Sequence, residues 1–283
     1  MFVHNECYMN RFAARKVWWP PNVEAVRPFM DEVPVVMLWQ CPESLVKEFR
    51  PWVFRTRPFY TPLIDLSRSE EELLQKLEPK SCRYEVRKAQ KMDCVITLNQ
   101  DIETGRLLMN RSIQHLQYRS PIGEDEWRAL LKDHDIFVCK WQDAPVAVHV
   151  LLRDFPGRAR LLLSATEDRN NERFRAVAGP ANRLLHWHEI QSYKAQGYKF
   201  YDFGGCDDPA GPKTSPTYSI SQFKLSFGAE VVSEPMLYLT RKPGLRMFLK
   251  SMAAARNGLK RIPWPQSWLK ALRSRPKLGQ LFR

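Results

Sequence analysis

The sequence predicts an α+β fold in which a central, mostly antiparallel sheet is flanked by helices. Residues 95–240 are predicted in the order β-α-α-β-β-β-α-β-α-β. Tight turns join the three consecutive strands, which favours an antiparallel meander, and the following helix delivers a late parallel strand. The composition is that of a globular protein, since 44% of the 283 residues are hydrophobic and 27% are charged.

The first 94 residues are expected to form a separate N-terminal segment. Its first 60 residues are rich in proline and aromatic side chains, and residues 33–40 are the one clear strand there. Ser69 followed by Glu72 is a capping box, which predicts a helix with leucines on its apolar side. Pro79 restarts the helix a few residues later.

A basic stripe covers the three turns after this proline. Most stripes of this kind are solvated helix faces. The alternative is a cradle for a phosphate-bearing substrate, with Arg83 and Arg87 as the candidate substrate-binding residues. The stripe consists of Lys80, Arg83, Arg87, Lys88 and Lys91.

The elements from residue 94 to residue 240 are separated by clear turn signals. Pro180 at the start of one helix and Gly197 just past its end mark its limits. Gly228 closes the last helix. The elements are strand 94–98, helices 101–118 and 123–133, strands 136–141, 146–153 and 159–165, helix 180–196, strand 198–203, helix 219–227, and one or two strands in 230–240.

The C-terminal tail, residues 241–283, is strongly basic. It holds twelve Lys or Arg and no Asp or Glu, so it accounts for nearly all of the net charge of +13. Apolar residues at 245, 248, 252, 255, 259 and 262 recur at steps of three and four, which predicts an amphipathic helix. Three interpretations stay open: an anchor on an anionic membrane, a helix packed on the protein body, and a surface for polyanions such as RNA.

The sequence predicts a cytoplasmic protein that holds no metal. Its apolar runs are too short for a membrane span, and its first 30 residues show no secretory signal. The six cysteines form no C-x-x-C pair or zinc spacing, and we expect reduced thiols. His186 and His188, two residues apart, do not share a helix face, so we interpret them as ordinary core or surface histidines.

Two stretches carry a family resemblance. One runs from residue 64 to residue 77 and on into residues 83–91; the other combines Y-D-F-G-G at 201–205 with I-S-Q-F-K-L-S-F-G at 220–228. Together they resemble the Fem-type (FemAB-like) transferases, a branch of the Gcn5-related N-acetyltransferase (GNAT) fold, whose element order matches that of residues 95–240. The resemblance covers roughly residues 60–240.

The resemblance implies an acyltransferase. It would move an acyl or aminoacyl group onto an amine of a cell-envelope glycan or peptidoglycan-type precursor, at the cytoplasmic face of the inner membrane. Cell-wall members usually carry two copies of the fold. On that basis residues 1–94 are a reduced partner half, residues 95–240 the GNAT-like domain, and residues 241–283 the basic amphipathic tail.

Lys224 is the first candidate catalytic residue. It lies between Phe223 and Phe227 in a predicted short helix, and a lysine that points into a cleft can stabilise the oxyanion formed when an amine attacks an ester or thioester. The family's F-K-x-x-F-G lysine lies at the acyl-transfer site, so the resemblance implies this role for Lys224 and a pocket wall at Phe223. The alternative is that both phenylalanines are core and Lys224 is a surface residue.

Asp202 is the second candidate catalytic residue. It ends a predicted strand and precedes two glycines, which let a ligand approach the backbone closely. It is equally interpreted as a structural cap. Tyr201 and Tyr218 are candidate proton carriers and belong to the predicted substrate-binding set.

The donor is predicted to be a co-substrate, either aminoacyl-tRNA or acyl-CoA, with no bound cofactor. The CoA-binding pattern [Q/R]-x-x-G-x-[G/A] is not matched from Arg173 or from Arg175, which argues against ordinary CoA use. Gly179 and Pro180 still leave a helix N-terminus able to bind an anion, and with Arg175 they are the candidate donor-binding residues. Two other functions stay open: a CoA-dependent N-acyltransferase acting on an amino sugar in polysaccharide biosynthesis, and a non-catalytic membrane- or RNA-binding adaptor.

Overall fold

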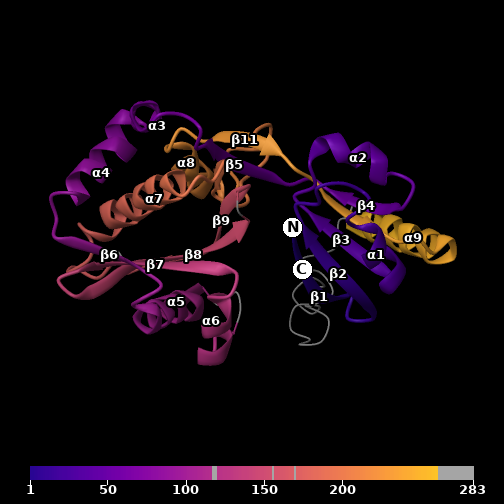
Figure 1. Ribbon diagram of the computed structural model, residues 1–283. Coiled ribbons are helices and arrows are strands. Elements are labelled where there is room, and N and C mark those ends of the chain that lie inside the picture. The colour runs from indigo at the N-terminus through magenta and orange to yellow at the C-terminus, as the bar shows by residue number, and fades with distance from the viewer. Residues whose placement is uncertain (117–119, 155, 169, 261–283) are drawn as a thin grey trace. The chain divides into compact units, whose positions relative to one another are not determined.

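The computed structural model describes residues 1–116, 120–154, 156–168 and 170–260. The chain divides into two compact units, one formed by Met1–Phe59 with the chain from Ser233 onward and the other by Tyr60–Val232 (Figure 1). Each unit has a mixed sheet with helices packed on it, so the predicted α+β class is confirmed. The boundaries predicted after residues 94 and 240 divide the chain at other points than these units do.

The first unit contains more strands than the sequence indicates. Its described strands form a sheet in the order β1-β2-β3-β12-β4. The expectation of one clear strand in the first 60 residues is wrong, because β1 to β4 all lie there. For example, β1 does not show the alternation of apolar and polar residues that predicts a strand, because it is an edge strand with mostly polar, exposed side chains. The elements are β1 (Phe2–Tyr8), β2 (Phe12–Trp18), α1 (Arg27–Glu32), β3 (Val35–Trp39), α2 (Glu43–Phe49), β4 (Val53–Arg57) and β12 (Met236–Leu239).

The predicted tail helix is present as α9 (Pro243–Lys260), but its buried side differs from the expected stripe. Leu249, which the stripe leaves out, is 2% exposed, and Leu245 packs into the same cluster against β4. Phe248 and Met252 are 48% and 39% exposed. Packing on the protein body is therefore one role of the helix. Residues 261–283 lie outside the described part of the chain. Among the residues that the structure describes, no helix is long and apolar enough to cross a bilayer.

The second unit contains the predicted meander and the late parallel strand. Its described strands form a sheet in the order β11-β5-β10-β9-β8-β7-β6, in which β10 is parallel to β9 and antiparallel to β5. Of the one or two strands predicted in 230–240, the structure has two, β11 in this sheet and β12 in the other. The strands are β5 (Tyr60–Asp65), β6 (Cys94–Leu98), β7 (His134–Trp141), β8 (Ala144–Asp154), β9 (Arg158–Thr166), β10 (Phe200–Asp202) and β11 (Glu230–Ser233).

Helices cover both faces of this sheet (Figure 1). Phe137 and Cys139 of β7 belong to the core under α7, whereas Ile136 and Val138 belong to the core under α5. Successive side chains of a strand point to opposite sides of a sheet. Because helices pack on both sides, both faces of β7 are buried. The helices are α3 (Glu70–Lys76), η1 (Pro79–Arg83), α4 (Tyr84–Ala89), α5 (Ile102–Leu116), α6 (Glu124–Leu130), α7 (Ala178–Ala195) and α8 (Tyr218–Leu225).

Three of the helix boundaries have the clear sequence signals that predict them. The predicted capping box is present: the Ser69 side chain accepts from the Glu72 N–H at 3.1 Å, and the Glu72 carboxylate accepts from the Ser69 N–H at 2.7 Å. The helical conformation restarts at Pro79 with the wide turn η1, and α4 follows directly. Gly197 adopts a φ of +83° just past α7, which is the backbone conformation that a helix-ending glycine provides.

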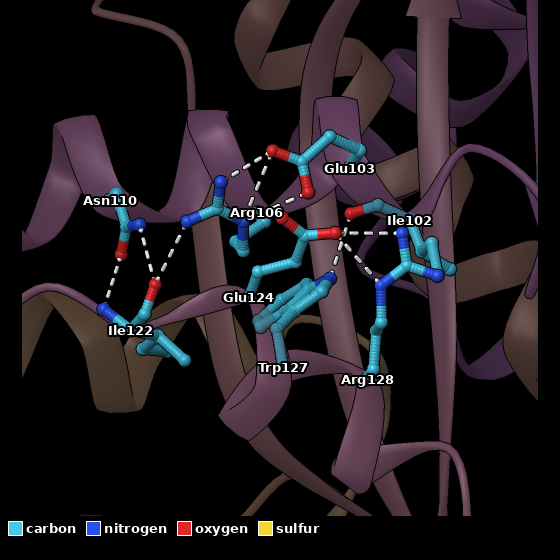
Figure 2. Close-up of polar contacts among 8 residues, drawn as sticks. All are labelled: Ile102, Glu103, Arg106, Asn110, Ile122, Glu124, Trp127 and Arg128. Atoms are coloured by element: carbon cyan, nitrogen blue, oxygen red, sulfur yellow. Dashed lines mark hydrogen bonds and ion pairs between the residues drawn. The ribbon is translucent and has the colours of Figure 1, made fainter.

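A set of polar contacts fastens α6 to α5 (Figure 2). Asn110 accepts from the N–H of Ile122 at 2.8 Å and donates to its carbonyl at 3.0 Å, and Arg106 donates to the same carbonyl at 3.1 Å. The Trp127 indole N–H donates to the Ile102 carbonyl at 2.7 Å. These bonds satisfy polar groups of the connection between the two helices, and so hold both on one face of the sheet.

Candidate functional site

A cavity of about 860 Å³ opens in the second unit beside the end of β10. The pairing of β10 with β9 ends at Asp202 and Arg160, but β9 continues to Thr166. The cavity is lined by this continuing part of β9, by residues 203–205 after β10, and by side chains of α7 and α8. Gly204 is required here: its φ is +71°, and a Cβ would lie 2.9 Å from the Leu161 carbonyl oxygen.

The cavity wall is cationic. Arg160, Arg183 and Lys224 line it together with His186, and the described lining residues include neither Asp nor Glu. Serine and asparagine side chains supply most of the remaining polar groups. Because fixed positive charges inside a concave surface attract anions, the wall favours a ligand that carries negative charge and hydroxyl groups.

Lys224 lies in the cavity wall, on α8. Its ammonium group donates to the carbonyl of Gly205 at 2.6 Å, which places it next to the glycine pair after β10. Burial lowers the pKa of Lys224, and the positive charge of Arg160 lowers it further. An ammonium group that is poorly solvated gains more from a developing negative charge than an exposed one does, so this position suits oxyanion stabilisation. The catalytic role itself stays a prediction.

The two phenylalanines beside Lys224 have different surroundings. Phe223 is half-buried, lines the cavity, and has the Arg183 guanidinium 4.6 Å from its ring centre. Phe227 is 1% exposed and packs in the core. Phe223 is therefore placed where the sequence predicts a pocket wall, and Phe227 anchors the helix that presents it.

Asp202 is fully buried and does not line the cavity. Its carboxylate accepts from the Thr61 hydroxyl at 2.5 Å and from the Gly204 N–H at 2.7 Å. It also pairs with Arg158 at 3.2 Å and with Arg160 at 3.9 Å. These contacts support the structural-cap interpretation, in which Asp202 fixes the glycine turn and directs Arg160 to the cavity.

Tyr201 is also fully buried, behind the cavity wall, and belongs to a closed hydrogen-bond network. Its hydroxyl donates to Glu189 at 2.5 Å and lies 2.7 Å from His186 Nδ1. Glu189 also lies 2.7 Å from His149 Nδ1, whose other ring nitrogen lies 2.9 Å from Asn182. Burial raises the pKa of Tyr201 well above its usual value, and Glu189 raises it further. Tyr201 thus contacts His186 rather than the cavity.

The remaining predicted substrate-binding residues are not brought to the cavity. The Arg83 guanidinium donates to the carbonyls of Gln75 and Leu77, at 2.6 and 3.1 Å, and so closes the junction after α3. Arg87 is exposed on α4, and Tyr218 is half-buried at the start of α8. None of the three lines the described cavity wall.

The predicted donor-binding residues are also separated from this wall. Gly179 and Pro180 are buried in the first turn of α7, and Arg175 is exposed before it. The N–H of Ala178, the first residue of the helix, already donates to the Phe174 carbonyl at 2.9 Å. The preceding turns thus continue into the helix, which leaves its N-terminus less open to an anion than the sequence predicts.

Several residues of the cavity, and Glu189 of the network behind it, were not predicted from the sequence. Asn182, His186 and Glu189 recur at steps of four and three, which puts them on one face of α7. The sequence interpretation considered only the pair His186 and His188, which are two residues apart and do not share a helix face. It did not consider the residues three and four positions from His186, which do share its face. Arg160, a charge at the start of an apolar strand, was the second available signal.

His149, His186 and Glu189 have ligand atoms within 4.8 Å of one another, a grouping that can hold a metal ion. The Nδ1 atoms of both histidines already have hydrogen-bond partners inside the network: His149 Nδ1 contacts Glu189, and His186 Nδ1 contacts Tyr201. A cation would have to displace these bonds. We therefore interpret the group as a hydrogen-bond network.

The cavity lies largely within a segment that matches a known family. Residues 78–212 match the model described as an acetyltransferase (GNAT) domain. This segment is similar to GNAT domains. It contains β9 and α7, which supply Arg160, Arg183 and His186, whereas Lys224 follows its end. The prediction of an acyltransferase is thus confirmed at the level of the domain. A search of curated protein sequences finds no match.

The chain is similar to solved structures over most of its length. FemX matches with a TM-score of 0.67 and 14% identity, over 87% of this chain and 86% of that one. The C-terminal domain of a putative lysylphosphatidylglycerol synthetase from Agrobacterium fabrum matches with a TM-score of 0.58 and 12% identity, over 87% of both chains. L-PGS from Bacillus licheniformis matches with a TM-score of 0.54 and 12% identity, over 88% of this chain and 84% of that one. At these identities the likeness establishes the fold, and the predicted Fem-like GNAT architecture is confirmed.

Proposed function

We propose that this protein transfers an acyl or aminoacyl group from an ester or thioester donor to an amine of a cell-envelope component. The observation that carries the proposal is the cavity wall, where Lys224 lies beside Phe223 and two arginines without an acidic neighbour in the described lining. The similarity to FemX and to the C-terminal domain of a putative lysylphosphatidylglycerol synthetase supports an acceptor of the cell envelope.

Lys224 acts on the carbonyl oxygen of the donor in this proposal. Attack by an amine turns the planar carbonyl into a tetrahedral oxyanion, whose charge is strongest in the transition state. The ammonium group is held beside Gly205 before the substrate arrives, so little reorganisation is needed at that moment. Loss of one such donor in other enzymes lowers kcat by roughly 10²–10³.

Arg160 and Arg183 bind the anionic part of a substrate. Arg160 is 6% exposed and is oriented by Asp202, whereas Arg183 pairs with Glu85 at 2.8 Å and lies over Phe223. Guanidinium groups held in this way match phosphate oxygens well. The aminoacyl-tRNA terminus, acyl-CoA and a phosphate-linked acceptor all offer such oxygens.

Transfer assays with variants at Lys224 test the proposal. The full chain is incubated with alanyl-tRNA or with acetyl-CoA, and with two amine acceptors, a lysine-containing peptidoglycan precursor and an amino-sugar phosphate. We expect Lys224→Met to lower kcat by about 10²–10³ and Lys224→Arg to restore part of it, because the charge is retained. Lys213→Met changes an exposed lysine before α8 and serves as the control.

The outcomes separate the competing functions. Transfer from alanyl-tRNA supports the Fem-like activity, whereas saturable use of acetyl-CoA supports an N-acyltransferase acting on an amino sugar. Absence of transfer with every donor and acceptor, or full activity of Lys224→Met, contradicts the proposal and favours the non-catalytic adaptor. The full chain is needed, because a protein ending at residue 240 would lose the packing of α9 through Leu249.

A further inference from the structure

His186 lies where the cavity meets the buried network. Its ring lines the cavity together with Lys224 and Phe223, and is also packed among Phe203 and Phe227, with ring centres at 5.0 and 5.2 Å. Its Nδ1 reaches away from the cavity to the Tyr201 hydroxyl at 2.7 Å. Within the described part of the chain, no protein group forms a hydrogen bond with its second ring nitrogen, Nε2.

The network determines which nitrogen of His186 carries the proton. His149 and the hydrogen bonds it makes lower the pKa of Glu189 even though burial opposes this, so the carboxylate is ionised. It can only accept, and the Tyr201 hydroxyl must donate to it across 2.5 Å. The Tyr201 oxygen then accepts from His186 at 2.7 Å, which requires Nδ1–H. The lone pair is therefore on Nε2.

We infer that His186 is the proton acceptor for the attacking amine, and that Tyr201 and Glu189 are positioning residues that hold its ring and tautomer. This inference rests on the proposed function. It explains why two buried polar groups, Tyr201 and Glu189, converge on the ring of His186, which reaches the cavity.

The proton transfers balance as follows. An uncharged amine forms the new C–N bond while the carbonyl oxygen becomes an oxyanion beside the Lys224 ammonium. The amine then passes one proton to His186 Nε2. When the C–O or C–S bond of the donor breaks, the imidazolium returns this proton to the leaving oxygen or sulfur. The products are an amide and an alcohol or thiol, and His186 is neutral again.

The groups around His186 fit this cycle. Burial lowers its pKa to about 4, and His149 and Lys224 add to this, while Glu189 acts in the opposite direction. The ring is therefore uncharged and able to accept a proton at neutral pH. During the reaction the negative charge of the oxyanion compensates the positive charge of Lys224, which otherwise opposes protonation of His186. The Glu189 carboxylate, behind Tyr201, stabilises the imidazolium form of His186.

The first test needs no substrate. The full chain is labelled with ¹⁵N-histidine, and the ring nitrogens of His186 are assigned by comparison with His186→Gln. We expect the Nδ1–H form at pH 7, and a mixture of tautomers in Tyr201→Phe, which lacks the oxygen that accepts from Nδ1. An Nε2–H form in the unaltered protein overturns the inference, whatever the outcome of the transfer assays.

The second test measures transfer with the donor and acceptor that the wild-type protein uses. We expect His186→Gln to lower kcat by roughly 10²–10⁴ with little change in KM, and Tyr201→Phe to lower kcat about tenfold with a shifted pH–rate profile. His188→Gln, on the exposed side of the same helix, is the matched control. Wild-type activity that survives in His186→Gln contradicts the inference alone, whereas an inactive wild-type protein contradicts the proposed function.

Discussion

Asp202 is a buried carboxylate for which the sequence leaves two roles open, a catalytic group and a structural cap. Its position at a strand end before two glycines fits both roles in the sequence. In the structure it accepts from Thr61 and Gly204 and pairs with two arginines, all inside the protein. These contacts hold the turn after β10 in place, and Asp202 does not line the cavity.

The variant Asp202→Asn distinguishes these roles. We expect the free energy of unfolding to fall by about 3–5 kcal/mol, because Arg158 and Arg160 lose a buried counter-ion. Urea denaturation measures it. Asp143→Asn makes the same charge change on an exposed turn and is expected to have little effect. Unchanged stability together with lost transfer would instead make Asp202 catalytic.

The contact between α5 and the sheet depends on one glycine. A Cβ at Gly105 would lie 2.9 Å from Val138 Cγ2 and 3.1 Å from Val148 Cγ2, so the helix lies close to the strands at this point. A larger side chain must push the helix and the sheet apart.

Gly105→Val is expected to lower the free energy of unfolding by about 1–3 kcal/mol, the usual range for an overpacked core. Thermal or urea unfolding measures it. Gly123→Ala is the control, because nothing lies within 4 Å of the position of its Cβ. Equal stability of the two variants would mean that α5 can move away from the sheet at little cost.

The elements that the sequence predicted well have local signals. The meander β7 to β9 and the helices α5 to α7 show clear periodicity and turn residues, and the Ser69 capping box determines its own helix. β5 was missed because it contains a proline and its partner β10 lies more than a hundred residues later. No local pattern indicates such a pairing.

The residues of the candidate site also divide into those with a local sequence signal and those whose role depends on the tertiary structure. Lys224 was found because it belongs to a motif in a single helix. The roles of His186 and Arg160 depend on tertiary neighbours, since Tyr201 and Asp202, which they contact, come from β10. Their chemistry could be recognised only after the sheet had placed β9, β10 and α7 together.

At the scale of the whole molecule, charge and exposed apolar surface coincide on the C-terminal helix. In α9, Leu249 faces the first unit, while Met247 is 71% exposed and Phe248 48% exposed. Lys250 is exposed on the same helix, and the sequence from residue 241 onward has basic residues but no acidic ones. Basic and apolar side chains together favour the surface of an anionic bilayer, with about 1 kcal/mol for each basic residue near it.

We therefore expect the full chain to co-sediment with anionic phosphatidylglycerol vesicles at low salt, and much less with neutral phosphatidylcholine vesicles. Rising salt should weaken binding because it screens the charges. The double variant Met247→Ser, Phe248→Ser should bind less without losing stability, since both side chains are exposed. Leu249→Ala is the contrasting variant: it should lower stability by about 2–5 kcal/mol, because Leu249 is buried. If the protein stays in the supernatant with anionic vesicles at low salt, α9 serves only to pack on the first unit, and the membrane-face location proposed for the enzyme is wrong.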